Sequence, residues 1–99
     1  MKVLLVCAGG MSTSILMKKM EKYAAANGIE PFEIAAVGLG AYRDVCDNYD
    51  CILMGPQVGY QKDSVASSTG MKVDVIAPAD YGIGNCENIF KQIDKLLAA

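Results

Sequence analysis

The stretch with the clearest chemistry is a cysteine followed by small and hydroxyl-bearing residues: Cys7, Ala8, Gly9, Gly10, Met11, Ser12, Thr13 and Ser14. Small residues allow a tight turn in which successive backbone N–H groups converge, and such converging donors favour an anion such as phosphate. The three hydroxyl groups can add further donors. The segment therefore predicts a phosphate-binding loop in which Cys7 is the nucleophile.

A helix expected after this loop bears on the reactivity of Cys7, because the positive end of a helix dipole favours a thiolate over a thiol. The chain contains no histidine, which is the commonest general base and a usual phosphoryl carrier. Covalent chemistry must then use another nucleophile, and Cys7 is the candidate. The alternative is that Cys7 is a small buried residue at a strand end, and for Cys46, Cys51 and Cys86 we predict that packing role.

Alternating strand and helix patterns position this loop. Apolar runs predict strands at 3–6, 32–37, 51–54 and 73–76, and the first is expected at the centre of a parallel sheet. Helices are expected from a cap at Ser12 or Ser14 to Asn27, over 41–49, over about 58–68, and from Asn85 onward.

This β-α-β-α-β-α-β-α order predicts an α/β fold with one domain, residues 1–99. Its four-stranded parallel sheet would carry helices on both faces, as an open sandwich of flavodoxin-like or Rossmann-like type. Ligands bind at the carboxyl ends of the strands in such folds, and Cys7 is expected there.

Composition argues against several classes of function. The net charge of −2 gives no electrostatic footprint for nucleic acid or anionic lipid, so neither partner is expected. Four cysteines without a Cys-x-x-Cys pair, in a chain without histidine, argue against a metal site. The apolar run at 3–8 is too short for a signal-peptide core, so we expect reduced thiols, a cytoplasmic location and no direct membrane insertion.

The run Cys-x-x-Gly-Met-Ser-Thr-Ser at 7–14 resembles the phosphocysteine loop of enzyme IIB components of the bacterial sugar phosphotransferase system, lactose/cellobiose/chitobiose family. Gly55-Pro56-Gln57-Val58, after the third strand, and Tyr81-Gly82, after the fourth, resemble that family's other loops at the same end of the sheet. The resemblance covers nearly the whole chain.

The resemblance implies a relay in which a phosphohistidine on a IIA protein passes its phosphoryl group to Cys7. Cys7 would pass it to a β-glucoside-type or other disaccharide, which only the membrane-embedded IIC protein binds. Residues 8–14 would hold the phosphoryl group, with Gln57 and Tyr81 on loops that flank the cysteine; the alternative for each of these two is a packing or surface role. Separately, the position of Met11 at the crest of the loop makes it a candidate exposed contact for a partner. Neither a cofactor nor a metal is implied.

The main alternative is a low-molecular-weight protein tyrosine phosphatase or a related arsenate reductase, which resembles this layout in its cysteine loop. Those enzymes need an arginine after five intervening residues, and Thr13 stands there, so the guanidinium clamp is absent. Asp80-Tyr81 superficially resembles their general-acid segment, but we expect Asp80 in a solvated loop.

A flavodoxin-like binding or receiver module is the non-enzymatic alternative, since this architecture hosts many functions. A receiver needs an acidic cluster after the first strand, where this chain has cysteine and glycines. Gly38-Leu39-Gly40 does not complete a dinucleotide-binding fingerprint, because Arg43 stands at the third glycine position. We expect a turn at these two glycines.

Overall fold

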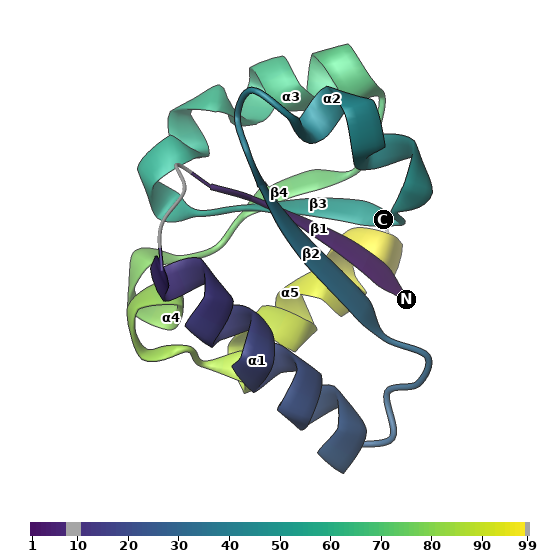
Figure 1. Cartoon of the computed structure of the whole chain (residues 1–99), viewed down its shortest axis with the longest axis vertical. Coiled ribbons are helices and arrows are strands. Elements are labelled where there is room, and N and C mark those ends of the chain that lie inside the picture. The colour runs from purple at the N-terminus through teal and green to yellow at the C-terminus, as the bar shows by residue number, and fades with distance from the viewer. Residues whose placement is uncertain (8–10, 99) are drawn as a thin grey trace.

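Strand β1, Lys2–Cys7, lies inside a four-stranded parallel sheet of order β2-β1-β3-β4 (Figure 1). This computed structural model describes residues 1–7 and 11–98, and of residues 11–13 the backbone alone. Residues 3–6 of β1 pair with 34–37 on one side and with 51–54 on the other, and all four are fully buried. The expected central position of the first strand is confirmed.

The described elements follow the predicted alternation, with additional short helices. The other strands are β2 (Glu33–Gly38), β3 (Cys51–Met54) and β4 (Val73–Val75). The α-helices are α1 (Met11–Ala26), α2 (Tyr42–Val45), α3 (Lys62–Thr69), α4 (Pro78–Ile83) and α5 (Cys86–Ala98), and the 3-10 helices are η1 (Cys46–Asn48) and η2 (Pro56–Gln61). None of the described helices is long and apolar enough to cross a membrane.

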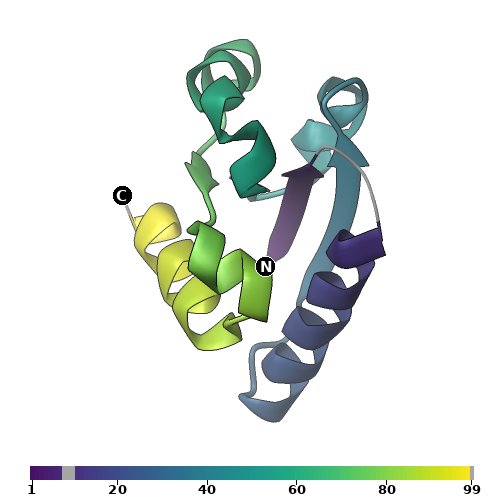
Figure 2. The same cartoon turned by 90° about the vertical axis from the view of Figure 1, so that its left-hand side faces the viewer.

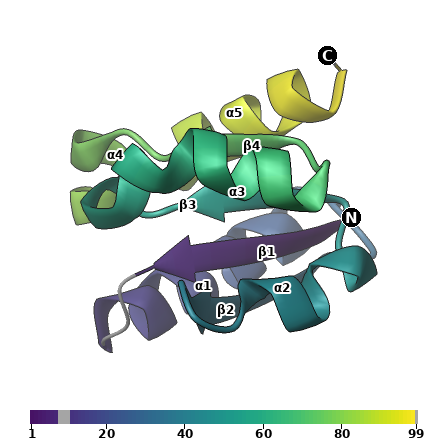
Figure 3. The same cartoon turned by 90° about the horizontal axis from the view of Figure 1, so that it is seen from above.

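Two apolar clusters cover the two faces of the sheet. Alternate side chains of a strand point to opposite faces, so the unbroken apolar run of β1 needs cover on both. Val3 and Leu5 join the cluster under α1 and α5, whereas Leu4 and Val6 join the cluster under α2, η2 and α3. Figures 2 and 3 show the sheet between these helical layers, which confirms the predicted fold class.

The segment after β3 differs from the expected single helix over 58–68. It forms η2 and then α3, and η2 lies against β4, because a Cβ on Gly59 would lie 2.9 Å from Val75 Cγ1. Val58 and Val65 anchor the two helices in the core.

Helix α4 occupies a segment that the sequence analysis placed in a loop. Pro78 opens it with a φ already suited to a helix, and Gly84 ends it in the left-handed region at φ 65°. Asp80 therefore lies in a helix rather than a solvated loop, and its carboxylate accepts a hydrogen bond of 3.1 Å from Asn88 Nδ2.

Two smaller expectations concern turns and caps. Helix α1 begins at Met11, so Ser12 and Ser14 lie within its first turn and neither precedes it as a cap. The expected turn after β2 is confirmed, because Ala41 N–H donates to the Gly38 carbonyl at 3.1 Å.

The outer edge of β4 is closed at Val75 by side chains. Ile76 N–H bonds inward to the Met54 carbonyl, so the backbone groups of the preceding residue, Val75, face outward. Val75 N–H donates to Asp74 Oδ1 at 2.9 Å, and the Val75 carbonyl accepts from Gln92 Nε2 at 2.6 Å. Gln92 Nε2 also donates to Asp74 Oδ2 at 2.9 Å, which links all three residues.

This network sets the ionisation of Asp74. Partial burial opposes the charge, but the hydrogen bonds from Gln92 and Val75, with Lys62 at 3.7 Å, outweigh it and lower the pKa of the Asp74 carboxyl. A carboxyl group with a lowered pKa stabilises the fold above its unfolded pKa, and this stability is lost as pH falls through the folded value.

We therefore expect Asp74→Asn to lower the free energy of unfolding at pH 7, by roughly 1 kcal/mol because the site is partly exposed. The difference from the wild type should shrink as pH falls below about 4, where an unperturbed carboxyl protonates. Urea unfolding at pH 7, 5 and 3 measures this. Asp94→Asn, at an exposed position of α5, is the matched control, and a pH-independent difference for Asp74→Asn would contradict the account.

Candidate functional site

Cys7 ends β1 at the edge of the sheet where the carboxyl ends of the parallel strands meet. In Figure 3 the β1 and β3 arrows point to the same side of the molecule, and α4 lies on that side. The residue is only 4% exposed, and its Sγ donates a weak hydrogen bond of 3.8 Å to the Val37 carbonyl of β2. Cys7 thus stands where this fold places ligands, with its sulfur directed toward β2.

Gly55 is the point on which three distant parts of the chain converge. It follows β3, and its N–H donates to the Val6 carbonyl at 2.9 Å, directly beside Cys7. A Cβ on Gly55 would lie 3.0 Å from Gln57 Oε1, 3.6 Å from Cys7 Cβ and 3.6 Å from Tyr81 Cε2. The structure therefore brings together the cysteine and the two residues that the sequence predicted to flank it, with Gln57 on η2 and Tyr81 on α4.

The predicted phosphate loop is described only in part. Ala8, Gly9 and Gly10 lie outside the described residues, and so do the side chains of residues 11–13. The backbone begins α1 at Met11, and Ser14 is exposed in its first turn. A helix of 16 residues thus starts close after Cys7, which puts the positive end of its dipole on this side of the sheet. The phosphate-binding role of residues 8–14 stays a prediction.

Helix α4 is held against α1 by a lysine. Lys19 Nζ donates to the Ile83 carbonyl at 3.3 Å, and a Cβ on Gly84 would lie 2.8 Å from Lys19 Cδ. This close contact fixes the helix that carries Tyr81. A cavity of about 130 Å³ lies between the two helices, lined by Ile15, Leu16, Lys19, Tyr81, Gly82 and Gly84.

Sequence analysis missed the roles of Gly55 and Lys19. Gly55 was predicted to end a strand and to belong to a loop at this end of the sheet, without a role of its own, and the partner of Lys19 lies 64 residues away.

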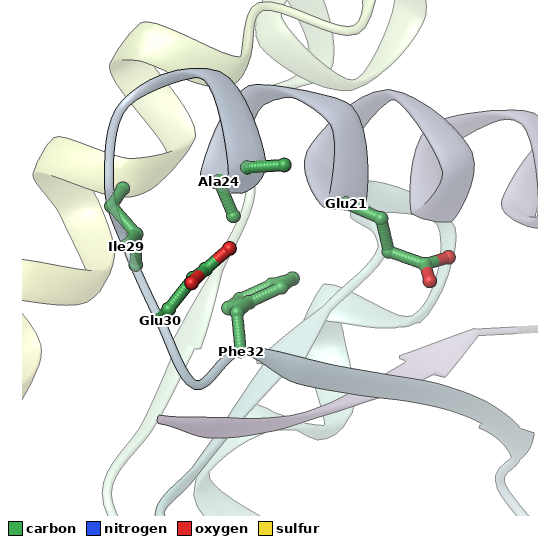
Figure 4. Close-up of a pocket in the computed structure, with 6 residues that line it drawn as sticks. Glu21, Ala24, Ile29, Glu30 and Phe32 are labelled. Atoms are coloured by element: carbon green, nitrogen blue, oxygen red, sulfur yellow. The ribbon is translucent and has the colours of Figure 1, made fainter.

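A second cavity, of about 180 Å³, lies at the other end of the molecule (Figure 4). It is lined by Glu21, Ala24, Ala25, Ile29, Glu30 and Phe32. Phe32 precedes β2, whose first residue pairs with Lys2, whereas Cys7 pairs with the last residue of β2. This cavity is therefore at the amino ends of the strands, and none of the predicted site residues lines it.

The other three cysteines are buried, as their predicted packing roles require. Burial raises the pKa of the Cys51 thiol to about 11, with a further contribution from Asp50, and burial also raises the pKa of the Cys86 thiol. Both remain thiols at neutral pH. Over residues 1–7 and 11–98, no three side chains of the metal-binding types lie close enough together to hold a metal ion.

The fold and the site define a flavodoxin-like α/β domain with a cysteine at the carboxyl end of an inner strand of its sheet. The chain also matches, over residues 2–92, the model of the family described as "PTS system, Lactose/Cellobiose specific IIB subunit". It belongs to this family of phosphotransferase-system IIB components, which confirms the resemblance found in the sequence.

Similar proteins differ in the sugar that their names give. The chain is 35% identical to the oligo-beta-mannoside-specific EIIB component of Bacillus subtilis, over 97% of this chain and 95% of the relative. It is 33% identical to the lactose-specific EIICB component of Lactococcus lactis, over 80% of this chain but 14% of that longer protein. The solution structure of the cellobiose-specific IIB component of Borrelia burgdorferi superposes with a TM-score of 0.80 at 32% identity, covering 99% and 92% of the two chains.

The crowding at Gly55 is testable. Its φ of −63° is open to any residue, so what excludes a side chain there is space. We expect Gly55→Ala to displace the flexible Gln57 side chain while the fold survives, with a loss of roughly 1 kcal/mol or less. The NMR signals of the Gln57 side-chain amide and the thermal unfolding midpoint measure both effects.

Gly40→Ala is the control for that substitution, because nothing lies within 4 Å of the added Cβ. Gln57 amide signals that stay at their wild-type positions in Gly55→Ala would show that Gln57 does not lie against Gly55.

Proposed function

We propose that this protein carries a phosphoryl group on Cys7, taken from a phosphohistidine of a IIA protein and passed to a sugar bound by a membrane-embedded IIC protein. The observation that carries the proposal is the position of Cys7 at the end of a buried strand, close before the start of α1 and beside Gln57 and Tyr81. Membership of the IIB family supports it.

The first transfer forms an S–P bond and breaks a P–N bond. Cys7 Sγ attacks phosphorus, the electron pair of the P–N bond returns to the imidazole of IIA, and the thiol proton ends on that nitrogen. In the second transfer a sugar hydroxyl attacks phosphorus, the S–P pair returns to sulfur, and the hydroxyl proton restores the thiol. Neither step needs a cofactor or a metal.

The protein contributes alignment and charge stabilisation. The transition state of phosphoryl transfer is loose, so catalysis consists mainly of holding donor and acceptor in line and neutralising charge on the phosphoryl oxygens. The backbone N–H groups of residues 8–14 and the N-terminus of α1 are the proposed source of that stabilisation.

The IIC partner has support from the longer relative. In the lactose-specific EIICB component a segment similar to this chain is part of one polypeptide with the rest of that protein. We propose that this IIB domain meets its IIC partner at the cytoplasmic face of the membrane, and that IIC alone selects the sugar.

Exposed apolar side chains give a second line of support for protein partners. Among the described residues the large apolar side chains that are most exposed are Ile15 at 60%, Tyr60 at 79% and Ile83 at 69%. They lie on α1, η2 and α4, the same elements that flank Cys7. An apolar rim of this kind suits a protein surface that docks around the cysteine.

The phosphocysteine assignment separates Cys7 from the other thiols. We expect wild type, Cys46→Ser, Cys51→Ser and Cys86→Ser each to gain one phosphate after incubation with phosphoenolpyruvate, the general phosphotransferase proteins and a cognate IIA. Cys7→Ser should gain none, because a serine hydroxyl is far harder to ionise. Intact-protein mass spectrometry measures the added phosphate. A Cys7→Ser protein that passes phosphate to sugar at near wild-type rate would contradict the phosphocysteine mechanism.

The partner surface has its own test. We expect Ile15→Asp to slow transfer from IIA by about tenfold or more, because docking would bury a carboxylate against apolar groups. Met11→Asp should act in the same way if Met11 also faces the partner. Ala25→Asp, on the exposed far end of α1, is the control and should transfer at the wild-type rate. Equal rates for Ile15→Asp and Ala25→Asp would remove Ile15 from the interface.

A further inference from the structure

We propose that the side-chain amide of Gln57 binds the phosphoryl group on Cys7, by donating Nε2–H to one of its oxygens. The inference rests on the proposed function and adds a specific phosphoryl ligand to it. That ligand comes from η2, on the β3 side of the site, and not from the loop that follows β1.

The Gln57 amide lies near Cys7. Gln57 Oε1 and Cys7 Cβ both lie within 3.6 Å of the point where a Cβ of Gly55 would stand. In a phosphorylated Cys7 the phosphorus lies two bonds beyond Cβ and the phosphoryl oxygens lie three bonds beyond it, which brings these oxygens into the range of the Gln57 amide. The absence of a side chain on Gly55 keeps this space open.

The Gln57 amide is available to bind an anion. The described part of the chain contains no hydrogen bond to the side-chain amide of Gln57, and the residue is exposed. The oxygen and nitrogen ends of a glutamine amide exchange by rotation about the last side-chain bond. The amide can therefore turn its Nε2–H donors toward an anion without breaking a hydrogen bond to any described residue.

A phosphoryl group on Cys7 would point away from β2 and toward Gln57. In the resting thiol, Sγ donates to the Val37 carbonyl at 3.8 Å on the β2 side. Phosphorylated sulfur has no proton to donate, and the carbonyl oxygen repels the negative phosphoryl oxygens. The phosphoryl group is thus directed away from β2, and Gln57 lies on the opposite side, beside β3.

A neutral donor also suits a relay. A guanidinium would bind a phosphoryl dianion by two charge-assisted hydrogen bonds and hold it strongly. An amide supplies a weaker neutral hydrogen bond, which aligns the group and still lets it leave for the sugar. The function of Gln57 would accordingly be to orient the phosphoryl group during both transfers.

The test uses two measurements on the full chain. Gln57→Glu keeps the size of the side chain but replaces the amide donor by a negative charge. Gln57→Ala removes the amide without adding a charge. Gln61→Glu makes the same charge change at the other end of η2 and is the matched control. Titration with inorganic phosphate, followed by backbone amide shifts, gives binding without any partner, and phosphoryl acceptance from IIA gives transfer.

We expect Gln57→Glu to weaken phosphate binding and slow acceptance by about tenfold or more, and Gln57→Ala by about threefold, with Gln61→Glu near wild type. Wild-type phosphate affinity in both Gln57 variants would overturn the inference, even if Cys7 accepts the phosphoryl group normally. A wild-type protein that accepts no phosphoryl group would instead overturn the proposed function, and the phosphate titration would still decide whether Gln57 binds the anion.

Discussion

Strand β1 hydrogen-bonds to β2 on one side and to β3 on the other, and residues 3–6 have no contact with water. A strand held in this way cannot slip by one residue without turning its apolar side chains to the wrong faces of the sheet. Its last residue, Cys7, is therefore fixed at one height relative to the ends of its neighbours. Gly38 lies beside it on β2, and Gly55 follows β3 at the same level. The site depends on this register before any loop is considered.

From that fixed point the rest of the site is assembled by packing rather than by charge. Gly55 lets η2 and α4 approach the cysteine, and Lys19 holds α4 to α1. The groups that the structure brings to Gly55 and Cys7 include the Val37 carbonyl, the Gln57 amide and the Tyr81 ring. Backbone and amide dipoles that are already in place need little reorganisation when a charged group arrives. This arrangement agrees with a protein that holds a phosphoryl group briefly between two partners.

Sequence patterns were sufficient for the strands, because the apolar runs of β1 and β3 are unbroken and bounded by glycine or polar residues. They also placed Cys7 at the carboxyl end of the sheet, and the resemblance to the IIB family placed Gln57 and Tyr81 at the same end. They did not predict α4 or the division between η2 and α3, because short helices depend on tertiary contacts such as that of Gly59 with Val75. The convergence on Gly55 could not be predicted either, because it joins segments that are far apart in the sequence and a local pattern does not encode contacts between such segments.

The closed edge of β4 has a consequence for how the protein behaves in a crowded solution. A strand at the border of a sheet normally offers unpaired amides to any passing chain, and sheets grow into aggregates by adding strands there. At Val75 both backbone groups are already taken, one by Asp74 and the other by Gln92. A foreign strand would have to displace two side chains that also bind each other. At Val75 this border of the sheet is thereby protected against the addition of a foreign strand.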